Sequence, residues 1–473
     1  MSIKWRTDEA IESIVRYGTN LAELSDVRGN LVSAVDHEVK VSGLLPDQRY
    51  FYSIGTFSEV LAGGDENHFF VTPPVPGAKK PTRIWAIGDC GTASFRHPGS
   101  AMVRDGYLNF AGTNHTDVWL MLGDNAYNAG TDSEYQVAVF QTYPTLLRST
   151  LLWSTLGNHE TYGPDQEGRI AYHDIFSLPA NAEAGGVISG TENYYSFDYA
   201  NIHFVCLDSE LSAREPDSPM AQWLHANLAA NTNEWVIAFW HSPPYTKGSH
   251  DSDNMLDNLG NMTFMRTNFV SILESYGVDL VLCGHSHNYE RSFLINGHYG
   301  FSASLMPEMI KDGGSGRPED TGAYRKPAGP EGNEGAVYVV AGSSGHATAL
   351  QPTRHPAMFI TLLKMGSMVI DISDNRLDAK FLRETGAIDD HFTIIKGGPA
   401  EQLLIVRARV QNGHVEIAWK SQAGRKYQIE QANDPKNDPW QIASPEIIAT
   451  GATCFWSSAA PDAKVFYRVK KPE

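Results

Sequence analysis

Short runs in which apolar and polar residues alternate occupy the N-terminal part of the chain. SIKWRT, SIVRYG, HEVKVSGL, YFYSIGTF and HFFVTPP follow this pattern, with turn residues between them. A period of two is typical of strands with one buried face. Residues 1–79 are therefore predicted to form a small antiparallel β-sandwich, and the Pro/Gly-rich VTPPVPGAKKP (71–81) is predicted to be a linker.

The C-terminal part of the chain alternates in the same way. After the Gly/Pro-containing boundary segment TIIKGGPAEQ (393–402), the alternating runs are LLIVRARV, HVEIAWKS, RKYQIEQA, TCFWSSA and VFYRVKK. This pattern predicts a second small β-sandwich over residues 396–473.

The central part of the chain, residues 80–395, has a different pattern of apolar and polar residues. Buried-type strands such as IWAIGD, VWLMLGD, LWSTLGN, HFVCLD, WVIAFWH, DLVLCGH and VYVVAG alternate with amphipathic stretches. Helices are predicted over 100–111, 219–230 and 264–276, because each carries an apolar stripe. The alternation predicts a layered α/β domain, with a long surface loop at the Gly/Pro/Ser-rich 301–335.

Composition narrows the possible partners. Hydrophobic residues make up 42% and charged residues 19% of the 473, and no stretch approaches the roughly 18 apolar residues of a membrane helix. Asp and Glu outnumber Lys and Arg by 55 to 37, so a net charge of -18 argues against nucleic acid as a structural partner. A small phosphate ester remains possible as a substrate if metal ions supply local positive charge.

The four cysteines do not form a CxxC pair, so each is predicted to be a small buried apolar residue: Cys90, Cys206, Cys283 and Cys454.

Metal-binding side chains follow five of the apolar runs. They lie in the segments GDCG, GDNAY, GNHE, WHSPPY and GHSHNYER, and the candidate ligands are Asp89, Asp124, Tyr127, Asn158, His241, His285 and His287. Oxygen and imidazole groups bind hard or borderline cations. One such segment alone is common in loops without any metal. Five in order, each closing an apolar strand, predict a metal site in the loops at one edge of the sheets.

The GHSH segment places two imidazoles two residues apart. In an extended chain, His285 and His287 point to the same side, so they can reach two neighbouring metal ions. The two oxygens of Asp124 can bridge such a pair.

The ordered set GDCG, GDNAY, GNHE, WHSPPY and GHSH resembles the metallophosphoesterases, and among them the purple acid phosphatases. The resemblance covers residues 82–395 strongly, and the N-terminal region is similar to the fibronectin-III-like domain of plant and many bacterial members. It implies an α/β fold, a four-layer metallophosphoesterase β-sandwich flanked by helices, with all-β sandwich domains at 1–79 and 396–473 on either side of a catalytic domain at 80–395. It implies no role for the C-terminal domain.

The resemblance also implies a ligand set for Fe(III) and one divalent metal, which would be Zn, Mn or Fe. The Fe(III) ligands would be Asp89, Asp124, Tyr127 and His287. The second metal would be held by Asp124, Asn158, His241 and His285, with Asp124 bridging.

Tyr127 distinguishes the purple acid phosphatases from other metallophosphoesterases. Many of the latter have a histidine two residues after the first Asp, where this chain has Gly91. Tyr127, three residues after Asp124, can fill the place that this leaves. A phenolate suits a hard trivalent ion.

The implied reaction is acid hydrolysis of phosphate monoesters by a hydroxide activated at the metal pair. His159 and His250 are the candidates that protonate or hydrogen-bond the leaving group. Glu160 and Arg291 are expected to support the site through hydrogen bonds or ion pairs. AGSSGH (341–346) is assigned no role.

Three other functions stay open. The same metal pair could serve a phosphodiesterase or nucleotide hydrolase, and a tyrosine-bound iron pair could be redox-active. The protein could instead be a surface-binding module whose two β-sandwiches attach to glycan or protein.

The first residues, MSIKWRTDEAIESIV, lack the basic start and apolar run of a secretory signal. By resemblance, the protein is expected to be secreted or periplasmic. The sequence does not predict an oligomeric state.

Overall fold

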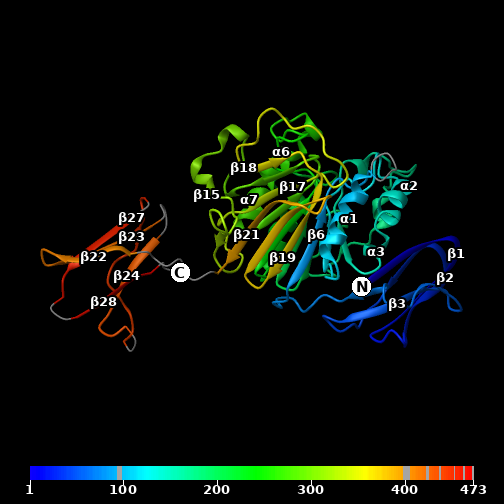
Figure 1. Cartoon of the computed structure of the whole chain (residues 1–473), viewed down its shortest axis with the longest axis horizontal. Coiled ribbons are helices and arrows are strands. Elements are labelled where there is room, and N and C mark those ends of the chain that lie inside the picture. The colour runs from blue at the N-terminus through cyan, green and yellow to red at the C-terminus, as the bar shows by residue number, and fades with distance from the viewer. Residues whose placement is uncertain are drawn as a thin grey trace. The chain divides into compact units, whose positions relative to one another are not determined.

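The computed structural model describes residues 1–92, 98–397, 405–421, 426–435, 438–451, 453–461 and 464–470. The chain divides into two compact units, Met1–Gly397 and Gly398–Glu473 (Figure 1). Of the predicted boundary segment 393–402, residues 398–402 lie outside the described residues.

The N-terminal strands pair in one five-stranded sheet with the order β2-β1-β3-β4, in which β5 also pairs with β3. The strands are β1 (Ser2–Gly18), β2 (Asp26–Lys40), β3 (Arg49–Gly55), β4 (Val60–Gly63) and β5 (Phe69–Val71). Val15 and Tyr17 are buried in the core of this sheet. Side chains of the sheet also reach the following region, where the Tyr52 hydroxyl donates to the carbonyl oxygen of Arg148 at 3.0 Å. The all-β prediction is therefore confirmed, while the likeness to fibronectin type III stays a prediction.

Two seven-stranded sheets form the centre of the first unit. The first central sheet has the order β16-β21-β20-β19-β6-β7-β8. Its strands are β6 (Thr82–Ile87), β7 (Val118–Met121), β8 (Leu151–Ser154), β16 (Tyr324–Lys326), β19 (Gly366–Ser373), β20 (Arg376–Arg383) and β21 (Ile388–Lys396). The second central sheet has the order β18-β13-β17-β12-β11-β10-β9. Its strands are β9 (Tyr195–Tyr199), β10 (Ile202–Cys206), β11 (Trp235–Trp240), β12 (Leu280–Cys283), β13 (Tyr289–Ser292), β17 (Val337–Ala341) and β18 (Met358–Leu362). A separate small hairpin pairs β14 (Leu294–Ile295) with β15 (Ile310–Asp312).

The central strands are buried on both faces, which explains their continuous apolar sequences. In β11, Ile237 and Phe239 belong to the core shared with the first central sheet. The alternate residues Val236, Ala238 and Trp240 belong to a second core on the helix side. Both faces of one strand are thus used for packing between layers.

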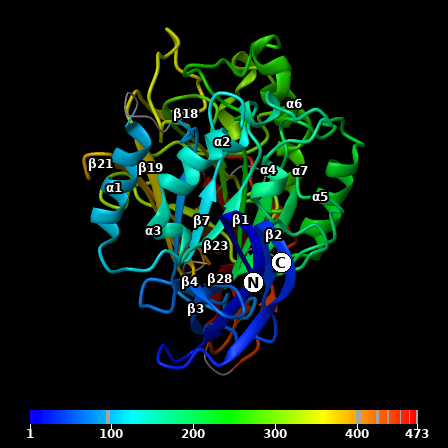
Figure 2. The same cartoon turned by 90° about the vertical axis from the view of Figure 1, so that its right-hand side faces the viewer.

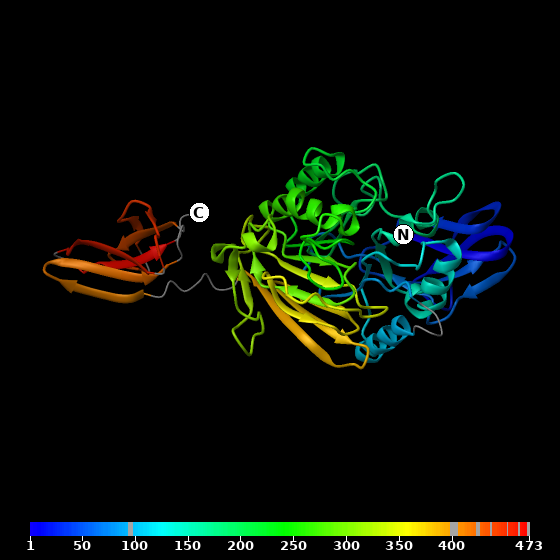
Figure 3. The same ribbon diagram turned by 90° about the horizontal axis from the view of Figure 1, so that it is seen from above.

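Helices cover the outer faces of the two sheets. They are α1 (Gly99–Ala111), α2 (Asp132–Tyr135), α3 (Pro144–Leu147), α4 (Tyr172–Ile175), α5 (Pro219–Ala230), α6 (Asn261–Asn268) and α7 (Val270–Ser275). Helix α1 contacts β19 and β20, while α5, α6 and α7 lie on the side of the second central sheet (Figure 2). Seen from above, the green helices and the yellow to orange strands β19 to β21 lie on opposite sides of the unit (Figure 3). The four-layer α/β fold is therefore confirmed.

The predicted helices at 100–111 and 219–230 are confirmed as α1 and α5. In α5, the side chain of Ser218 caps the first turn by accepting from Ala221 N–H. The predicted helix over 264–276 is confirmed in most of its length, but the structure divides it at Phe269 into α6 and α7. Phe269 is completely buried in the helix-side core, and its backbone still bonds to Met265 and Leu273 with helical spacing.

The prediction of a long surface loop over 301–335 is wrong in part. It contains β15 and β16, and β16 pairs in parallel with β21 at the edge of the first central sheet. Lys326 in β16 is buried and lies 2.6 Å from Asp279 Oδ1, while Lys396 lies 3.0 Å from Asp279 Oδ2. This buried charge cluster ties the segment to the start of β12.

The C-terminal unit is built from a three-stranded and a four-stranded sheet. Its strands are β22 (Ile405–Gln411), β23 (His414–Lys420), β24 (Lys426–Ala432), β25 (Gln441–Ile442), β26 (Ile447–Ile448), β27 (Thr453–Ala459) and β28 (Phe466–Lys470). Trp419, Tyr427 and Ile429 form its buried core. The all-β prediction is confirmed for this unit, while the division of the chain into domains at 1–79, 80–395 and 396–473 stays a prediction.

The four cysteines are free and buried, as predicted. Across the part of the chain that the structure describes, no helix is both long enough and apolar enough to cross a membrane.

Candidate metal centre

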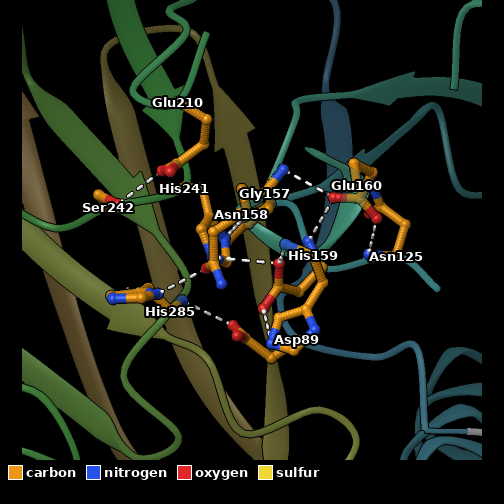
Figure 4. Close-up of polar contacts among 12 residues, drawn as sticks. Asp89, Asn125, Gly157, Asn158, His159, Glu160, Glu210, His241, Ser242 and His285 are labelled. Carbon is orange, nitrogen blue, oxygen red and sulfur yellow. Dashed lines mark hydrogen bonds and ion pairs between the residues drawn. The ribbon is translucent and has the colours of Figure 1, made fainter. Parts of the chain in front are cut away.

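Five turns carry the predicted ligands, and they follow β6, β7 and β8 of the first central sheet and β11 and β12 of the second. Strands β6, β7 and β8 are parallel to one another, as are β11 and β12. Parallel neighbours end at the same edge of a sheet, which brings these turns together. Figure 4 shows the side chains of Asp89, Asn158, His241 and His285 in one cluster. The structure places all seven predicted ligands there.

Three of the ligand residues have left-handed backbone conformations. The φ angles are 55° at Asp89, 52° at Asp124 and 65° at His285. This region costs a residue with a side chain roughly 1–2 kcal/mol. Strain of this kind concentrates at functional sites, where the surrounding structure holds it in place.

The glycines of the motifs make room for ligands from other strands. A Cβ atom at Gly157 would lie 2.2 Å from Asp124 Oδ1. A Cβ atom at Gly284 would lie 2.6 Å from Asp89 Oδ2 and 3.1 Å from His241 Nδ1. Any larger residue at these two positions would displace a predicted ligand.

A first group of donor atoms surrounds the Tyr127 hydroxyl. That hydroxyl lies 2.8 Å from Asp124 Oδ2 and 3.1 Å from Asp89 Oδ1. His287 Nε2 lies 3.3 Å from both the Tyr127 hydroxyl and Asp89 Oδ1. These four donors match the first predicted ligand set.

A second group surrounds Asn158 Oδ1. This oxygen lies 3.1 Å from His241 Nε2 and 3.0 Å from His285 Nδ1. His241 Nε2 also lies 3.4 Å from Asp124 Oδ1. The amide group of Asn158 donates to the Tyr162 hydroxyl at 2.8 Å, which directs Oδ1 toward the histidines.

The tautomer of His241 leaves an acceptor facing other acceptors. Its Nδ1 donates to the carbonyl oxygen of Leu122 at 2.9 Å, so a neutral ring has a lone pair at Nε2. This lone pair faces Asn158 Oδ1 and Asp124 Oδ1. Converging acceptors need a cation between them, either a proton or a metal ion.

Asp124 is shared between the two groups, since Oδ2 lies in the first and Oδ1 in the second. The seven residues therefore form two groups of potential metal ligands that share the Asp124 carboxylate. The two sheets contribute different atoms. The first central sheet supplies the oxygen donors of Asp89, Asp124, Tyr127 and Asn158, and the second supplies the imidazoles of His241, His285 and His287.

Charges within the cluster shift its protonation strongly. Burial opposes ionisation of Asp124, but the charge of His241 lowers the pKa of Asp124 below its usual value. Burial likewise opposes protonation of His241, yet Asp124 raises its pKa well above the usual value. Burial and the negative charges of Asp124 and Asp89 raise the pKa of Tyr127 well above its usual value. A metal cation would reverse this balance for Tyr127 and displace the proton of His241.

Glu160 supports the turn that carries Asp124. Its buried carboxylate accepts from the backbone N–H groups of Asp124, Asn125, Ala126 and Gly157 at distances between 2.7 and 3.2 Å (Figure 4). Arg291 instead pairs with Asp390 of β21 at 2.6 Å and donates to the Tyr324 hydroxyl at 3.2 Å, so it joins the two central sheets.

His159 and His250 lie at the exposed side of the cluster. His159 Nδ1 donates to the carbonyl oxygen of Asn128 at 2.6 Å, and its Nε2 lies 3.8 Å from Asp124 Oδ2. The ring of His250 stacks on His285 at 3.8 Å, and its Nδ1 lies 2.8 Å from Asp257 Oδ1. Both rings are only partly buried, which leaves them accessible to a ligand at the cluster.

Sequence reasoning missed two residues of this region. Asp257, the partner of His250, begins a short 3-10 helix (Asp257–Gly260), and the sequence around it contains no recognisable site motif. The ring of His346 lies 4.1 Å from that of His287 and 6.2 Å from that of Tyr127. Its signal was available, because AGSSGH follows the buried strand β17 just as the metal-binding turns follow theirs.

Comparison with known proteins agrees with this arrangement. Residues 82–289 match the family model described as Calcineurin-like phosphoesterase. Purple acid phosphatase 15 of Arabidopsis thaliana is 27% identical over 349 residues, which cover 65% of this chain and 62% of the relative. Acid phosphatase type 7 of Homo sapiens is 26% identical over 383 residues, which cover 74% of this chain and 76% of the relative. The structure of purple acid phosphatase PPD1 from yellow lupin (Lupinus luteus) seeds superposes with a TM-score of 0.62 at 16% identity, covering 84% of this chain and 72% of that chain.

Residues 82–289 thus match a calcineurin-like phosphoesterase domain, and the candidate site lies in the turns at one edge of its sheets. The chain's relatives include purple acid phosphatases, so the resemblance drawn from the motifs is confirmed. The matched region spans about three fifths of the length of plant relatives such as purple acid phosphatases 15 and 21 of Arabidopsis thaliana.

Proposed function

We propose that this protein is a metal-dependent acid phosphatase that hydrolyses phosphate monoesters. The observation that carries the proposal is the division of seven donors around the two oxygens of Asp124. The acid phosphatase relatives support the reaction class.

We assign Asp89, Asp124, Tyr127 and His287 to Fe(III). Asp124, Asn158, His241 and His285 are assigned to the divalent metal. Three oxygen donors, one of them a phenol, suit the harder trivalent ion. Asp, Asn and two His suit Zn, Mn or Fe at the second position. When bound, such a pair supplies a hydroxide at low pH and positive charge for the phosphate group.

The side chains at the mouth of the cluster have separate tasks in this proposal. Because Asn128 holds the Nδ1 proton of His159, Nε2 is the atom that faces a bound phosphate. Asp257 fixes His250 in the same way, so its Nε2 can hold a proton for the departing alcohol. Glu160 keeps the turn of Asp124 rigid during turnover. The substrate partner is therefore a small phosphate ester, and secretion or a periplasmic location stays a prediction of the resemblance.

The test is a visible absorption spectrum and metal analysis of the purified full chain. We expect iron with one divalent metal, and a tyrosinate-to-Fe(III) band that is lost in Tyr127→Phe but kept in the matched control Tyr276→Phe. Asp124→Ala should lose both metals and turnover together. An Asp124→Ala protein with full activity would overturn the assignment.

Substrate preference is measured in the same preparation. Faster turnover of p-nitrophenyl phosphate than of bis-p-nitrophenyl phosphate supports a monoesterase. The reverse ratio would make the protein a phosphodiesterase on the same metal pair.

A further inference from the structure

We propose that His346 is a positioning residue for Tyr127 and His287, two ligands assigned to Fe(III). The proposal rests on the phosphatase function and the metal pair proposed above. His346 ends the small-residue segment that follows strand β17 of the second central sheet.

The backbone around His346 is fixed to two of the metal-binding turns. Ser344 N–H donates to the carbonyl oxygen of Gly88 at 3.1 Å, next to Asp89. Thr348 N–H donates to the carbonyl oxygen of His287 at 3.0 Å. The segment that carries His346 is therefore attached on both sides to the turns that hold the first donor group.

Two glycines allow this segment to lie directly against Asp89. A Cβ atom at Gly342 would lie 2.7 Å from Asp89 Oδ2. A Cβ atom at Gly345 would lie 2.5 Å from the carbonyl oxygen of Asp89. Larger residues at either position would push the segment away, and His346 with it.

The ring of His346 contacts both ligand rings nearly at right angles. Its centroid lies 4.1 Å from that of His287 at an interplanar angle of 69°, and 6.2 Å from that of Tyr127 at 70°. Perpendicular contact is a favoured arrangement of aromatic rings. His159 is a second neighbour of the Tyr127 ring at 4.4 Å, and His250 is a second neighbour of the His287 ring at 6.4 Å. Removal of His346 would leave each ligand ring with one of these neighbours fewer.

The orientation of His287 decides whether the first donor group closes. Its Nε2 lies 3.3 Å from both Asp89 Oδ1 and the Tyr127 hydroxyl. Rotation of the ring about χ1 or χ2 would carry Nε2 out of this group. Residues that orient a metal ligand typically contribute roughly 10- to 100-fold to metal affinity or activity.

The experiment compares the parent full chain with His346→Ala and His346→Phe, each loaded with iron and one divalent metal. The readouts are the tyrosinate-to-Fe(III) band, the rate of iron loss to a chelator, and kcat and KM for p-nitrophenyl phosphate. In His346→Ala we expect a shifted and weaker band. Iron should be lost roughly 10- to 100-fold faster and kcat should be roughly 10- to 100-fold lower, while KM stays nearly constant. His346→Phe keeps a ring at this position and should restore the band and iron retention. Leu350→Ala, four residues further along the chain and exposed, is the control and should behave as the parent.

Each outcome decides the proposal. A His346→Ala protein with the parent band and iron retention overturns it, as does a change confined to KM, which would make His346 a substrate contact. A His346→Phe protein as impaired as His346→Ala also overturns it, because ring packing would then not be the cause. A parent protein without iron or the band would refute the proposed function instead, so the two failures are distinguishable.

Discussion

Replacement of Glu160 by glutamine should loosen the turn that holds Asp124. Each oxygen of the Glu160 carboxylate accepts from two backbone N–H groups, and the four donors are those of Asp124, Asn125, Ala126 and Gly157. A glutamine has only one amide oxygen, so its NH₂ group would face two of these donors. Hydrogen bonds to a charged group contribute about 1.5–3 kcal/mol each, so losing two costs about 3–6 kcal/mol before the turn relaxes.

The assay is denaturant unfolding of the metal-loaded protein together with elemental analysis. We expect Glu160→Gln to lower the free energy of unfolding by about 3 kcal/mol or more and to reduce metal content. Glu183→Gln is the control, because Glu183 is an exposed carboxylate that accepts from the Asn181 N–H at 2.8 Å and its change should stay within about 0.5 kcal/mol. A Glu160→Gln protein with the parent's unfolding midpoint and metal content would refute the reasoning.

Glu160 also predicts a pH dependence in the metal-free protein. Burial and the negative charge of Asp124 raise the pKa of Glu160 from 4.5 to about 7. A carboxyl whose pKa is higher in the folded state stabilises the fold fully below the unfolded value, and this stability is lost as the pH rises through the folded value. The free energy of unfolding should therefore fall by about 3 kcal/mol between pH 4.5 and 7, and Glu160→Gln should lack this fall.

Two buried charges give further predictions. Asp279 forms ion pairs with both Lys326 and Lys396, so Asp279→Asn should lower the free energy of unfolding by about 3–5 kcal/mol in a denaturant titration. Burial opposes ionisation of Asp390, but hydrogen bonds from Arg291 and its charge hold the pKa of Asp390 below the usual value. The stability that Asp390 contributes is present above its unfolded pKa of 3.8 and is lost as the pH falls through the lower folded value. Asp390→Asn should therefore be less stable than the parent at neutral pH, and its stability should change less as the pH falls into the acid range. Unfolding followed by circular dichroism at several pH values measures both effects. An unchanged midpoint for the first variant, or the parent's acid curve for the second, would contradict these expectations.

The sequence could predict which edge of the sheets carries the site, because each candidate ligand follows the end of an apolar strand. His241 follows β11 directly, and Asp124 comes three residues after the end of β7. Parallel neighbours share an end, so the turns of one sheet had to gather. The meeting of those turns with the turns of a different sheet depends on packing between layers, which no local pattern contains. The resemblance to a known family supplied that part.

Other features depended on contacts between distant residues. The division between α6 and α7 at Phe269 falls inside an amphipathic pattern that continues across it, so the pattern contains no sign of it. Strand β16 has only three residues in a Gly/Pro-rich segment, too short for a period of two to show, and its pairing with β21 stabilises it. The four donors around Glu160 converge from two turns that lie over 30 residues apart in sequence. Its place after Asn158 suggested support, but not which groups it would hold.

The separation of oxygen and nitrogen donors between the two central sheets has a consequence for maturation. Neither sheet alone offers a closed coordination set, so a cation pair would be captured late, after the layers have docked. Once bound, the cation pair would crosslink the two sheets at the edge where their turns meet. In the metal-loaded protein, the two sheets could then separate at this edge only as fast as the ions dissociate. The rate of unfolding of the loaded protein would therefore be limited by the rate of metal dissociation.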